Sequence, residues 1–322
     1  MSASVLFDAP GPKARARYRL AGILGGLLVL AFLVFALFQL GSKGNLTYDK
    51  WAMFLGLEVN DIDANVWIDY LLPGLLNTLK AAAISIVLAG IFGFLFGIGR
   101  MSQITVIRVF CGVVVEFFRS VPVLVMMLGA FYFYSFNNIF VADVNPLAAV
   151  VTGLTLYNGS VVAELLRSGV GSLPKGQSEA GLAIGLTRGQ TLRAIQLPQA
   201  VTAMLPALVG QLVVVLKDTA LGQIITYNEL LTNYQRIGST WGNIVPAMIV
   251  IAAMYIVINY ALTSLAAYVE RRLRQRGRVT IGAGGGGAVP LVVAGDVELS
   301  EFEVGGEDLD IDLDPGEADS RR

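Results

Sequence analysis

Long apolar runs alternate with short polar segments along most of this chain. A helix that crosses the hydrocarbon core of a membrane needs about 20 mostly apolar residues. Six stretches meet this requirement, at residues 20–40, 71–99, 106–136, 146–168, 200–225 and 244–268. The second and third are long enough to tilt or to extend into the membrane interface. The pattern therefore predicts an all-α integral membrane protein with about six transmembrane helices.

The first apolar run follows several basic residues, as the core of a secretory signal peptide also does. It covers residues 20–40, which is longer than the roughly 7–15 residues of a signal-peptide core. No small-x-small cleavage pattern stands out before Gly41-Ser42. We therefore expect a retained transmembrane helix.

The composition supports a membrane protein. Hydrophobic residues make up 55% of the chain and charged residues only 15%, whereas soluble domains have about 25% charged residues. The mean hydropathy is +0.67.

The basic residues predict the orientation, because cytoplasmic loops carry an excess of Lys and Arg. Basic residues precede the first run and follow the last, at Lys13, Arg15, Arg17, Arg19, Arg271, Arg272, Arg274, Arg276 and Arg278. Arg100 and Arg108 fall in the connection between the second and third runs. Residues 42–69 carry five acidic residues against two Lys, as an outer loop would. We expect a multi-pass protein with both termini in the cytoplasm.

The charge divides the chain into unequal parts. Residues 279–322 contain 11 acidic and 2 basic residues, a net charge of −9, so residues 1–278 carry +8. The tail begins with a glycine run at 282–287 that formally matches GxGxxG, but no strand precedes it and no helix follows, so we interpret it as a linker. We expect a disordered cytoplasmic tail.

Four segments follow from these boundaries. They are a cytoplasmic N-terminal segment at 1–19, the first transmembrane helix with an outer loop at 20–69, a transmembrane domain at 70–270 that includes a polar loop at 170–199, and the basic, then glycine-rich and acidic tail at 271–322.

The sequence lacks the residues that several kinds of function require. There is no His and a single Cys, Cys111, which excludes a disulfide within the chain and makes a zinc or haem site implausible. There is no GxxxxGK[ST] motif, so if transport is driven by ATP another chain must bind the nucleotide. No basic stripe with interleaved aromatic residues supports nucleic-acid binding.

The polar loop between the fourth and fifth runs has the signals of a helix, a turn and a second helix. Pro174 suits the start of a helix, and Gly185 with Gly189 can divide the loop into two short arms. Pro198 fits the first turn of the following helix. Such a hairpin would be a rigid body able to transmit force into two flanking helices.

The loop and several other motifs carry a family resemblance. Glu179-Ala180-Gly181, Gly185 and Leu197-Pro198 resemble the EAA loop of permease subunits of bacterial ABC importers, most closely the branch for polar amino acids. Further motifs of that branch occur at 74–79 (GLLNTL), 115–122 (VEFFRSVP), 163–167 (AELLR), 173–177 (LPKGQ) and 217–221 (KDTAL). The resemblance covers about residues 65–270.

The resemblance implies a coupling mechanism. In the family, a short helix of the loop sits in a groove on a cytoplasmic ATPase, whose closure switches the permease between inward-open and outward-open states. The implied coupling residues are Glu179, Ala180, Gly181, Gly185, Leu197 and Pro198. Gly181 stands where the family usually has Ala, and its helix propensity is lower by about 1 kcal/mol, which predicts a slightly looser first arm.

The resemblance also implies partners in a bacterial plasma membrane. These are an ABC ATPase dimer that binds ATP and Mg²⁺, a second permease subunit that is either identical or related, and an extracytoplasmic binding protein that delivers a polar amino acid. This chain would bind no cofactor and break no bond itself. Overall similarity to glutamate permeases favours glutamate as the substrate.

Charged residues inside the apolar runs are candidates for the substrate pathway, because a charge in hydrocarbon is costly. Glu116 and Arg119, like Glu164 and Arg167, are three residues apart and can pair on one helix face. We favour pairing between helices over direct contact of Arg119 or Lys217 with a substrate carboxylate. The tentative pathway residues are Glu116, Arg119, Tyr157, Asn158, Glu164, Lys217 and Asp218. Pro122 is expected to kink the third run.

Two other classes of protein remain as alternatives. An ion- or proton-coupled secondary amino-acid transporter, or a channel, would also carry paired charges but has no reason to keep a docking loop. A membrane-bound enzyme or scaffold would need a cluster of catalytic side chains, and a chain without His offers few.

Overall fold

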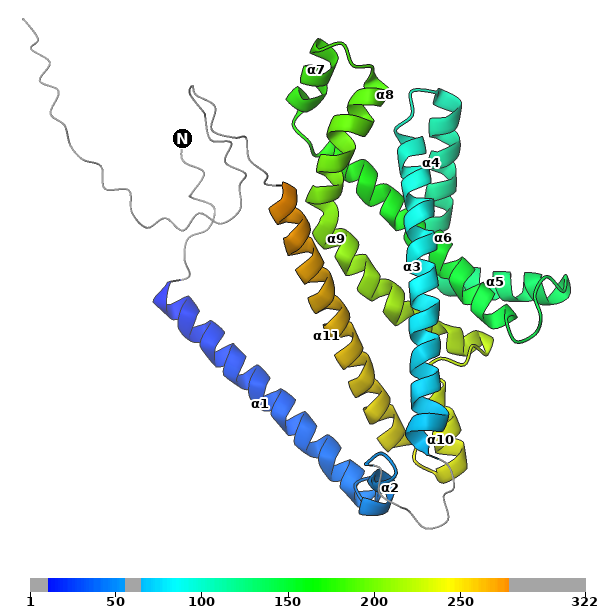
Figure 1. Ribbon diagram of the computed structural model, residues 1–322. Coiled ribbons are helices and arrows are strands. Elements are labelled where there is room, and N and C mark those ends of the chain that lie inside the picture. The colour runs from blue at the N-terminus through cyan, green and yellow to red at the C-terminus, as the bar shows by residue number, and fades with distance from the viewer. Residues whose placement is uncertain (1–10, 56–64, 278–322) are drawn as a thin grey trace, which may run out of the picture. The chain divides into compact units, whose positions relative to one another are not determined.

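The computed structural model describes residues 11–55 and 65–277, and no strand occurs among them (Figure 1). The order of elements is α1 (Pro12–Ser42), α2 (Tyr48–Ala52), the π-helix η2 (Trp67–Leu71), α3 (Leu72–Arg100), α4 (Thr105–Ser120), α5 (Val123–Phe136), α6 (Asn145–Gly171), α7 (Lys175–Ala183), α8 (Arg188–Thr191), the π-helix η3 (Leu192–Gln196), α9 (Leu197–Asp218), the 3-10 helix η4 (Thr219–Ile225), α10 (Asn233–Trp241) and α11 (Ile244–Gly277).

Helices long and apolar enough to cross a membrane account for most of the described chain. Five such segments occur in it, at Lys13–Ser42, Trp67–Arg100, Asn145–Gly171, Arg188–Ile225 and Ile244–Val269. They coincide with five of the six predicted runs, which confirms the all-helical membrane architecture. None of the described side chains of α1 is buried within the protein.

The third predicted run forms two helices instead of one kinked helix. The axes of α4 and α5 are bent by 99° at the break between Ser120 and Val123. Val121 there has φ −87° and ψ 128°, outside the helical region, because the ring of the following Pro122 disfavours a helical conformation. Among the described residues, a sixth candidate membrane span is obtained only if this bent pair is counted as one.

Helices α3 and α6 lie against each other in parallel, and glycines permit their close approach. A Cβ atom built on Gly93 would lie 2.5 Å from Cγ1 of Val162 and 2.9 Å from the carbonyl oxygen of Gly159. A Cβ atom on Gly97 would lie 3.2 Å from Cα of Ala163. Small residues four apart allow this kind of backbone contact between membrane helices. The interface fixes the Arg100 end of α3 beside the second half of α6.

Two apolar clusters organise the rest of the protein. One joins α3, α5, α6, α9 and η4 through Ala81, Met127, Ala149, Val150, Leu154, Val215, Ile225 and Tyr227. The other joins the segment after α2 to α10 and α11 through Met53, Phe54, Val66, Leu71, Leu230, Ile237, Ala247 and Ile251. Figure 1 shows α10 at one end of α3, and α7 with α8 at the other. The predicted outer loop therefore contributes buried side chains to the transmembrane domain.

Some sequence-based expectations fall outside the described residues. They concern the glycine run at 282–287 and the acidic tail, both within 278–322, and the acidic residues Glu58, Asp61 and Asp63 of the predicted outer loop.

Candidate functional site

A single arginine joins three helices near the end of α3. Arg100, the last residue of α3, donates from Nη1 to Glu164 Oε2 on α6 at 2.7 Å and from Nη2 to Glu116 Oε1 on α4 at 3.0 Å. Its side chain is only 13% exposed. A charge held this far from water needs partners, and two carboxylates supply them.

Two further arginines complete this ion-pair cluster. Arg119 lies 3.4 Å from Glu116 Oε1 and 3.8 Å from Glu164 Oε2, and Arg167 pairs with Glu164 within α6. The predicted pairs at a spacing of three residues are therefore present, and Arg100 connects them. Three cations and two anions give the cluster a net charge of +1. The cluster has an unbalanced positive charge to offer an anion.

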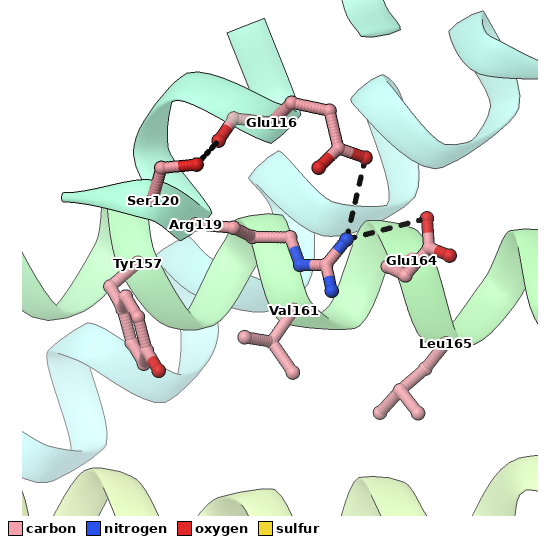
Figure 2. A pocket seen from close by; sticks show the side chains of 7 residues that line it. All are labelled: Glu116, Arg119, Ser120, Tyr157, Val161, Glu164 and Leu165. Atoms are coloured by element: carbon pink, nitrogen blue, oxygen red, sulfur yellow. Dashed lines mark hydrogen bonds and ion pairs between the residues drawn. The ribbon is translucent and has the colours of Figure 1, made fainter.

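A cavity of about 350 Å³ opens beside the cluster (Figure 2). It lies between α4 and α6 and is lined by Glu116, Arg119, Ser120, Tyr157, Val161, Glu164 and Leu165. The four residues from α6 follow a helical spacing and form one stripe. Figure 2 shows the guanidinium of Arg119 between the two carboxylates, with Tyr157 at one end of the cavity. The volume falls in the range of small-molecule sites.

The structure brings together four of the seven tentative pathway residues and leaves three elsewhere. Asn158 is fully buried and donates to the carbonyl of Leu154 at 2.9 Å, while its side-chain oxygen accepts from Gln211 on α9. Lys217 and Asp218 end α9 and do not line this cavity. Asn158 therefore joins α6 to α9 and is not in the lining of the cavity.

Arg100 is the functional candidate that the sequence analysis missed. We placed it in a cytoplasmic connection between two apolar runs, whereas it is the last helical residue of α3 and largely buried. No local signal pointed to Arg100, because Glu116 and Glu164 each already have an arginine three residues away. Only the α3–α6 packing brings a third arginine to them.

The polar loop has the predicted order of helix, turn and helix. Pro174 precedes α7, and Gly185 in the turn has φ +86°, a left-handed conformation that favours glycine. Thr187 caps α8 reciprocally with Gln190: its side chain accepts from Gln190 N at 3.3 Å, and its backbone N–H donates to Gln190 Oε1 at 2.8 Å. Gly189 lies inside α8 and not at the break. Leu197 and Pro198 begin α9.

Gly181 allows the two arms of the loop to touch. It is buried, and a Cβ atom built on it would lie 2.6 Å from Cγ2 of Thr191 and 3.1 Å from Cδ1 of Ile195. Gly181, whose low helix propensity predicts a looser arm, therefore lies at a close contact between α7 and α8–η3.

The opposite surface of α7 is open to solvent. Glu179 and Ala180 are exposed, and Ile184 just after α7 is 76% exposed. Glu179 and Ile184 therefore lie on a part of the loop that the described chain leaves uncovered.

No group of three or more His, Cys, Asp or Glu side chains with the arrangement of a metal site occurs in the described ranges. The side chains around the cavity form ion pairs and hydrogen bonds.

Comparisons with known proteins give a consistent result. Residues 89–275 match the family described as binding-protein-dependent transport system inner membrane component. The chain is 46% identical to the glutamate transport system permease protein GluD of Corynebacterium glutamicum, over 73% of this chain and 84% of that protein. It is 37% identical to the probable glutamine ABC transporter permease protein GlnP of Bacillus subtilis, over 64% and 93% of the two chains.

Solved structures show the same fold. A crystal structure of an amino acid ABC transporter with histidines matches with a TM-score of 0.57 and 28% identity, over 63% of this chain and 93% of that one. The MetNI methionine ABC transporter in an inward-facing conformation matches with a TM-score of 0.56 at 19% identity, which is a likeness of fold alone.

Proposed function

The chain belongs to the family of binding-protein-dependent transport system inner membrane components, and we propose that it is the membrane-spanning permease subunit of an ATP-driven importer of a polar amino acid, glutamate in particular. The match to a glutamate permease over 73% of the chain carries this proposal. The chain is a transport subunit and not an enzyme.

The ion-pair cluster supports an acidic substrate. Arg119 is the cation that both lines the cavity and keeps a side chain 36% exposed, so a substrate carboxylate can reach it. Glutamate carries two carboxylates and one ammonium group at neutral pH, and the cluster carries one excess positive charge. A guanidinium can hold a carboxylate through two hydrogen bonds. In this proposal Arg119 exchanges its long contact with Glu164 for the substrate.

The loop supports coupling to a separate ATPase. Glu179, Ala180 and Ile184 belong to its exposed surface, while Gly181 and Gly185 set the shape that presents them. The loop connects the end of α6 to the start of α9. A displacement of the loop therefore acts on both helices. We propose that an ATPase dimer that binds ATP and Mg²⁺ moves the loop and switches the cavity between the two sides of the membrane.

The remaining partners follow from the same proposal. A second permease subunit completes the pathway, and an extracytoplasmic binding protein delivers the amino acid. Both termini lie in the cytoplasm of a bacterial cell, with the loop on the same side. The family includes permeases of several amino acids, so a binding protein contributes to the choice among them.

The first test is purification of the tagged permease from native membranes, with and without Glu179→Arg. We expect the unmutated chain to carry a P-loop ATPase and the variant to lose it, because the reversed charge lies on the exposed surface of α7. Asp49→Arg is the matched control, an equally exposed acid reversed in the first turn of α2. Recovery of no ATPase with the unmutated chain would disprove the proposal.

The second test identifies the substrate and the energy source. Proteoliposomes containing the complex and its binding protein are loaded with ATP and given radiolabelled glutamate, with unlabelled glutamine, arginine or histidine as competitors. We expect ATP-dependent uptake that unlabelled glutamate suppresses and these three competitors do not. Uptake driven by an ion or proton gradient without ATP would instead establish a secondary transporter.

A further inference from the structure

A second cavity, of about 400 Å³, lies at the end of α3 remote from the coupling loop. Its polar lining comes from Asn77 and Lys80 on α3, Asp143 before α6, and Thr226, Tyr227 and Asn228 after η4. Twenty residues of α3 separate Lys80 from Arg100, which corresponds to about 30 Å at 1.5 Å per residue. We call it the distal cavity, and it shares no lining residue with the cavity of Figure 2.

Part of its wall is held rigidly by hydrogen bonds. Asn77 Nδ2 donates to the carbonyl of Asn228 at 2.7 Å, and the hydroxyl of Tyr227 donates to the carbonyl of Asn77 at 2.8 Å. Burial and the nearby Glu229 carboxylate raise the pKa of Tyr227 to about 12, so the hydroxyl keeps its proton and remains a donor. These two bonds fix the 227–228 segment against α3.

The backbone at the edge of this wall is strained. Thr226 has φ +63°, a left-handed conformation that β-branched residues rarely adopt. Such strain persists where the surrounding structure imposes it, and it is concentrated at functional sites. Here it turns the chain directly out of η4 and presents Tyr227 and Asn228 to the cavity.

The charged and polar groups of the distal cavity are available for a ligand. Lys80 and Asp143 come from different elements, are exposed, and form no ion pair with any residue in the described ranges. The side-chain oxygen of Asn228 is buried and accepts no hydrogen bond from the described part of the chain. A cation, an anion and an unused acceptor in one cavity are complementary to a zwitterion. A buried oxygen that accepts no hydrogen bond also favours a ligand that can donate one to it.

We propose that the distal cavity is a second amino-acid site, in which Lys80 binds the α-carboxylate and Asp143, with Asn228, binds the α-ammonium group. The choice of an amino acid rests on the proposed function. This site recognises the groups common to all α-amino acids, whereas the cationic cluster about 30 Å away along α3 recognises the side-chain carboxylate. A substrate would thus be received at one end of the protein and selected near the other.

The test uses analogues that lack one of the two recognised groups. The whole complex, in nanodiscs without binding protein, is titrated with radiolabelled glutamate in competition with 2-oxoglutarate, which has no ammonium group, and with γ-aminobutyrate, which has no α-carboxylate. We expect the unmutated complex to bind glutamate more tightly than either analogue by roughly tenfold or more, the effect of one charge-assisted contact.

Each substitution should remove one form of discrimination. Asp143→Asn should abolish the preference for glutamate over 2-oxoglutarate and keep the preference for glutamate over γ-aminobutyrate. Lys80→Met should keep the first preference and abolish the second. Lys80→Arg should restore the preference over γ-aminobutyrate. Lys43→Met and Asp49→Asn, exposed charges outside both cavities, serve as controls and should change neither preference.

The possible failures are distinguishable. If the unmutated complex imports glutamate with ATP, but Lys80→Met and Asp143→Asn bind all three ligands as the unmutated complex does, the distal site is disproved and the proposed function stands. If the same variants lose only the stimulation of ATP hydrolysis by the binding protein, the distal cavity is a protein-docking surface and the proposal is wrong. If the unmutated complex neither binds nor imports any amino acid, the proposed function is disproved, and the distal site, which rests on it, is disproved with it.

Discussion

Gly93 on α3 lies so close to Val162 on α6 that a Cβ atom on the glycine would be 2.5 Å from Cγ1 of the valine. Backbone atoms are also near, because the Gly159 carbonyl oxygen would be 2.9 Å away. The two helices can therefore move past each other only by separating. This interface positions the cluster of Arg100, Glu116 and Glu164.

Substituting Gly93 tests this packing. Gly93→Ala should lower the free energy of unfolding in detergent by about 1–3 kcal/mol, the usual cost of overpacking. Gly90→Ala on the same helix is the control, because no atom beyond the neighbouring backbone of α3 itself lies within 4 Å of its Cβ position. It should stabilise the protein by up to about 1 kcal/mol through helix propensity. Equal effects of the two substitutions on the unfolding midpoint would contradict the close contact.

Removing Arg100 should take one cation away from Glu116 and Glu164, which keep Arg119 and Arg167 as partners. We expect Arg100→Met to destabilise the protein by about 1.5–3 kcal/mol, the usual contribution of hydrogen bonds to charged groups. Arg108→Met should change stability by less than about 0.5 kcal/mol, because Arg108 is exposed and makes only long hydrogen bonds of 3.4 Å. Thermal unfolding in detergent measures both. The double variant Arg100→Met with Glu164→Gln should recover part of the loss.

The turn of the polar loop depends on the left-handed conformation of Gly185. Gly185→Ala should cost about 1–2 kcal/mol locally, because an L-residue is strained at φ +86°. The loop would then present Glu179 and Ile184 differently, so uptake driven by ATP should fall while the chain still folds. Gly189→Ala inside α8 should be tolerated, since its Cβ position is open. Limited proteolysis of the loop, together with uptake assays, separates the two variants.

Glu229 predicts a dependence of stability on pH. Its side chain is fully buried between η4 and α10, and it accepts from the backbone N–H groups of Leu231 and Thr232 and from the hydroxyl of Tyr255. Burial raises the pKa of the Glu229 carboxyl, although these hydrogen bonds oppose the shift. A raised pKa in the folded state means that the folded protein binds the proton more tightly than the unfolded one.

The sign of the effect follows from that difference. The stabilising contribution of Glu229 is complete below its unfolded pKa, near 4.5, and is lost as the pH rises through the higher folded value. Glu229→Gln, which cannot ionise, should therefore lose less stability than the unmutated protein between pH 4.5 and neutrality. Unfolding midpoints across this range measure the difference. Parallel pH profiles for the two proteins would show that the carboxyl does not titrate there.

Periodicity and length predicted the membrane helices well, because an apolar run of about 20 residues has few other stable states in a bilayer. At 106–136 the expected kink at Pro122 is larger than predicted, because Val121 leaves the helical region and the run divides into two helices bent by 99°. Hydropathy alone does not register one non-helical residue. It also gave no sign that Met53 and Phe54 of the predicted outer loop are buried.

The candidate site was predicted as pairs but not as a cluster. A spacing of three residues was enough to pair Glu116 with Arg119 and Glu164 with Arg167. The role of Arg100 depends on contacts between residues 64 positions apart, which no local pattern specifies. The opposite error concerns Lys217 and Asp218. Their charges predicted a place in the substrate pathway, but they do not line the cavity beside the ion-pair cluster.

The bridging position of Arg100 also constrains how the protein is made. Glu164 is translated 64 residues after Arg100, a delay of about 3–13 s at bacterial and eukaryotic synthesis rates of 5–20 residues per second. During that interval Glu116 on α4 is the one carboxylate of the ion-pair cluster available to Arg100, and Glu164 joins it when α6 is made. The cluster therefore cannot be complete before α6 is.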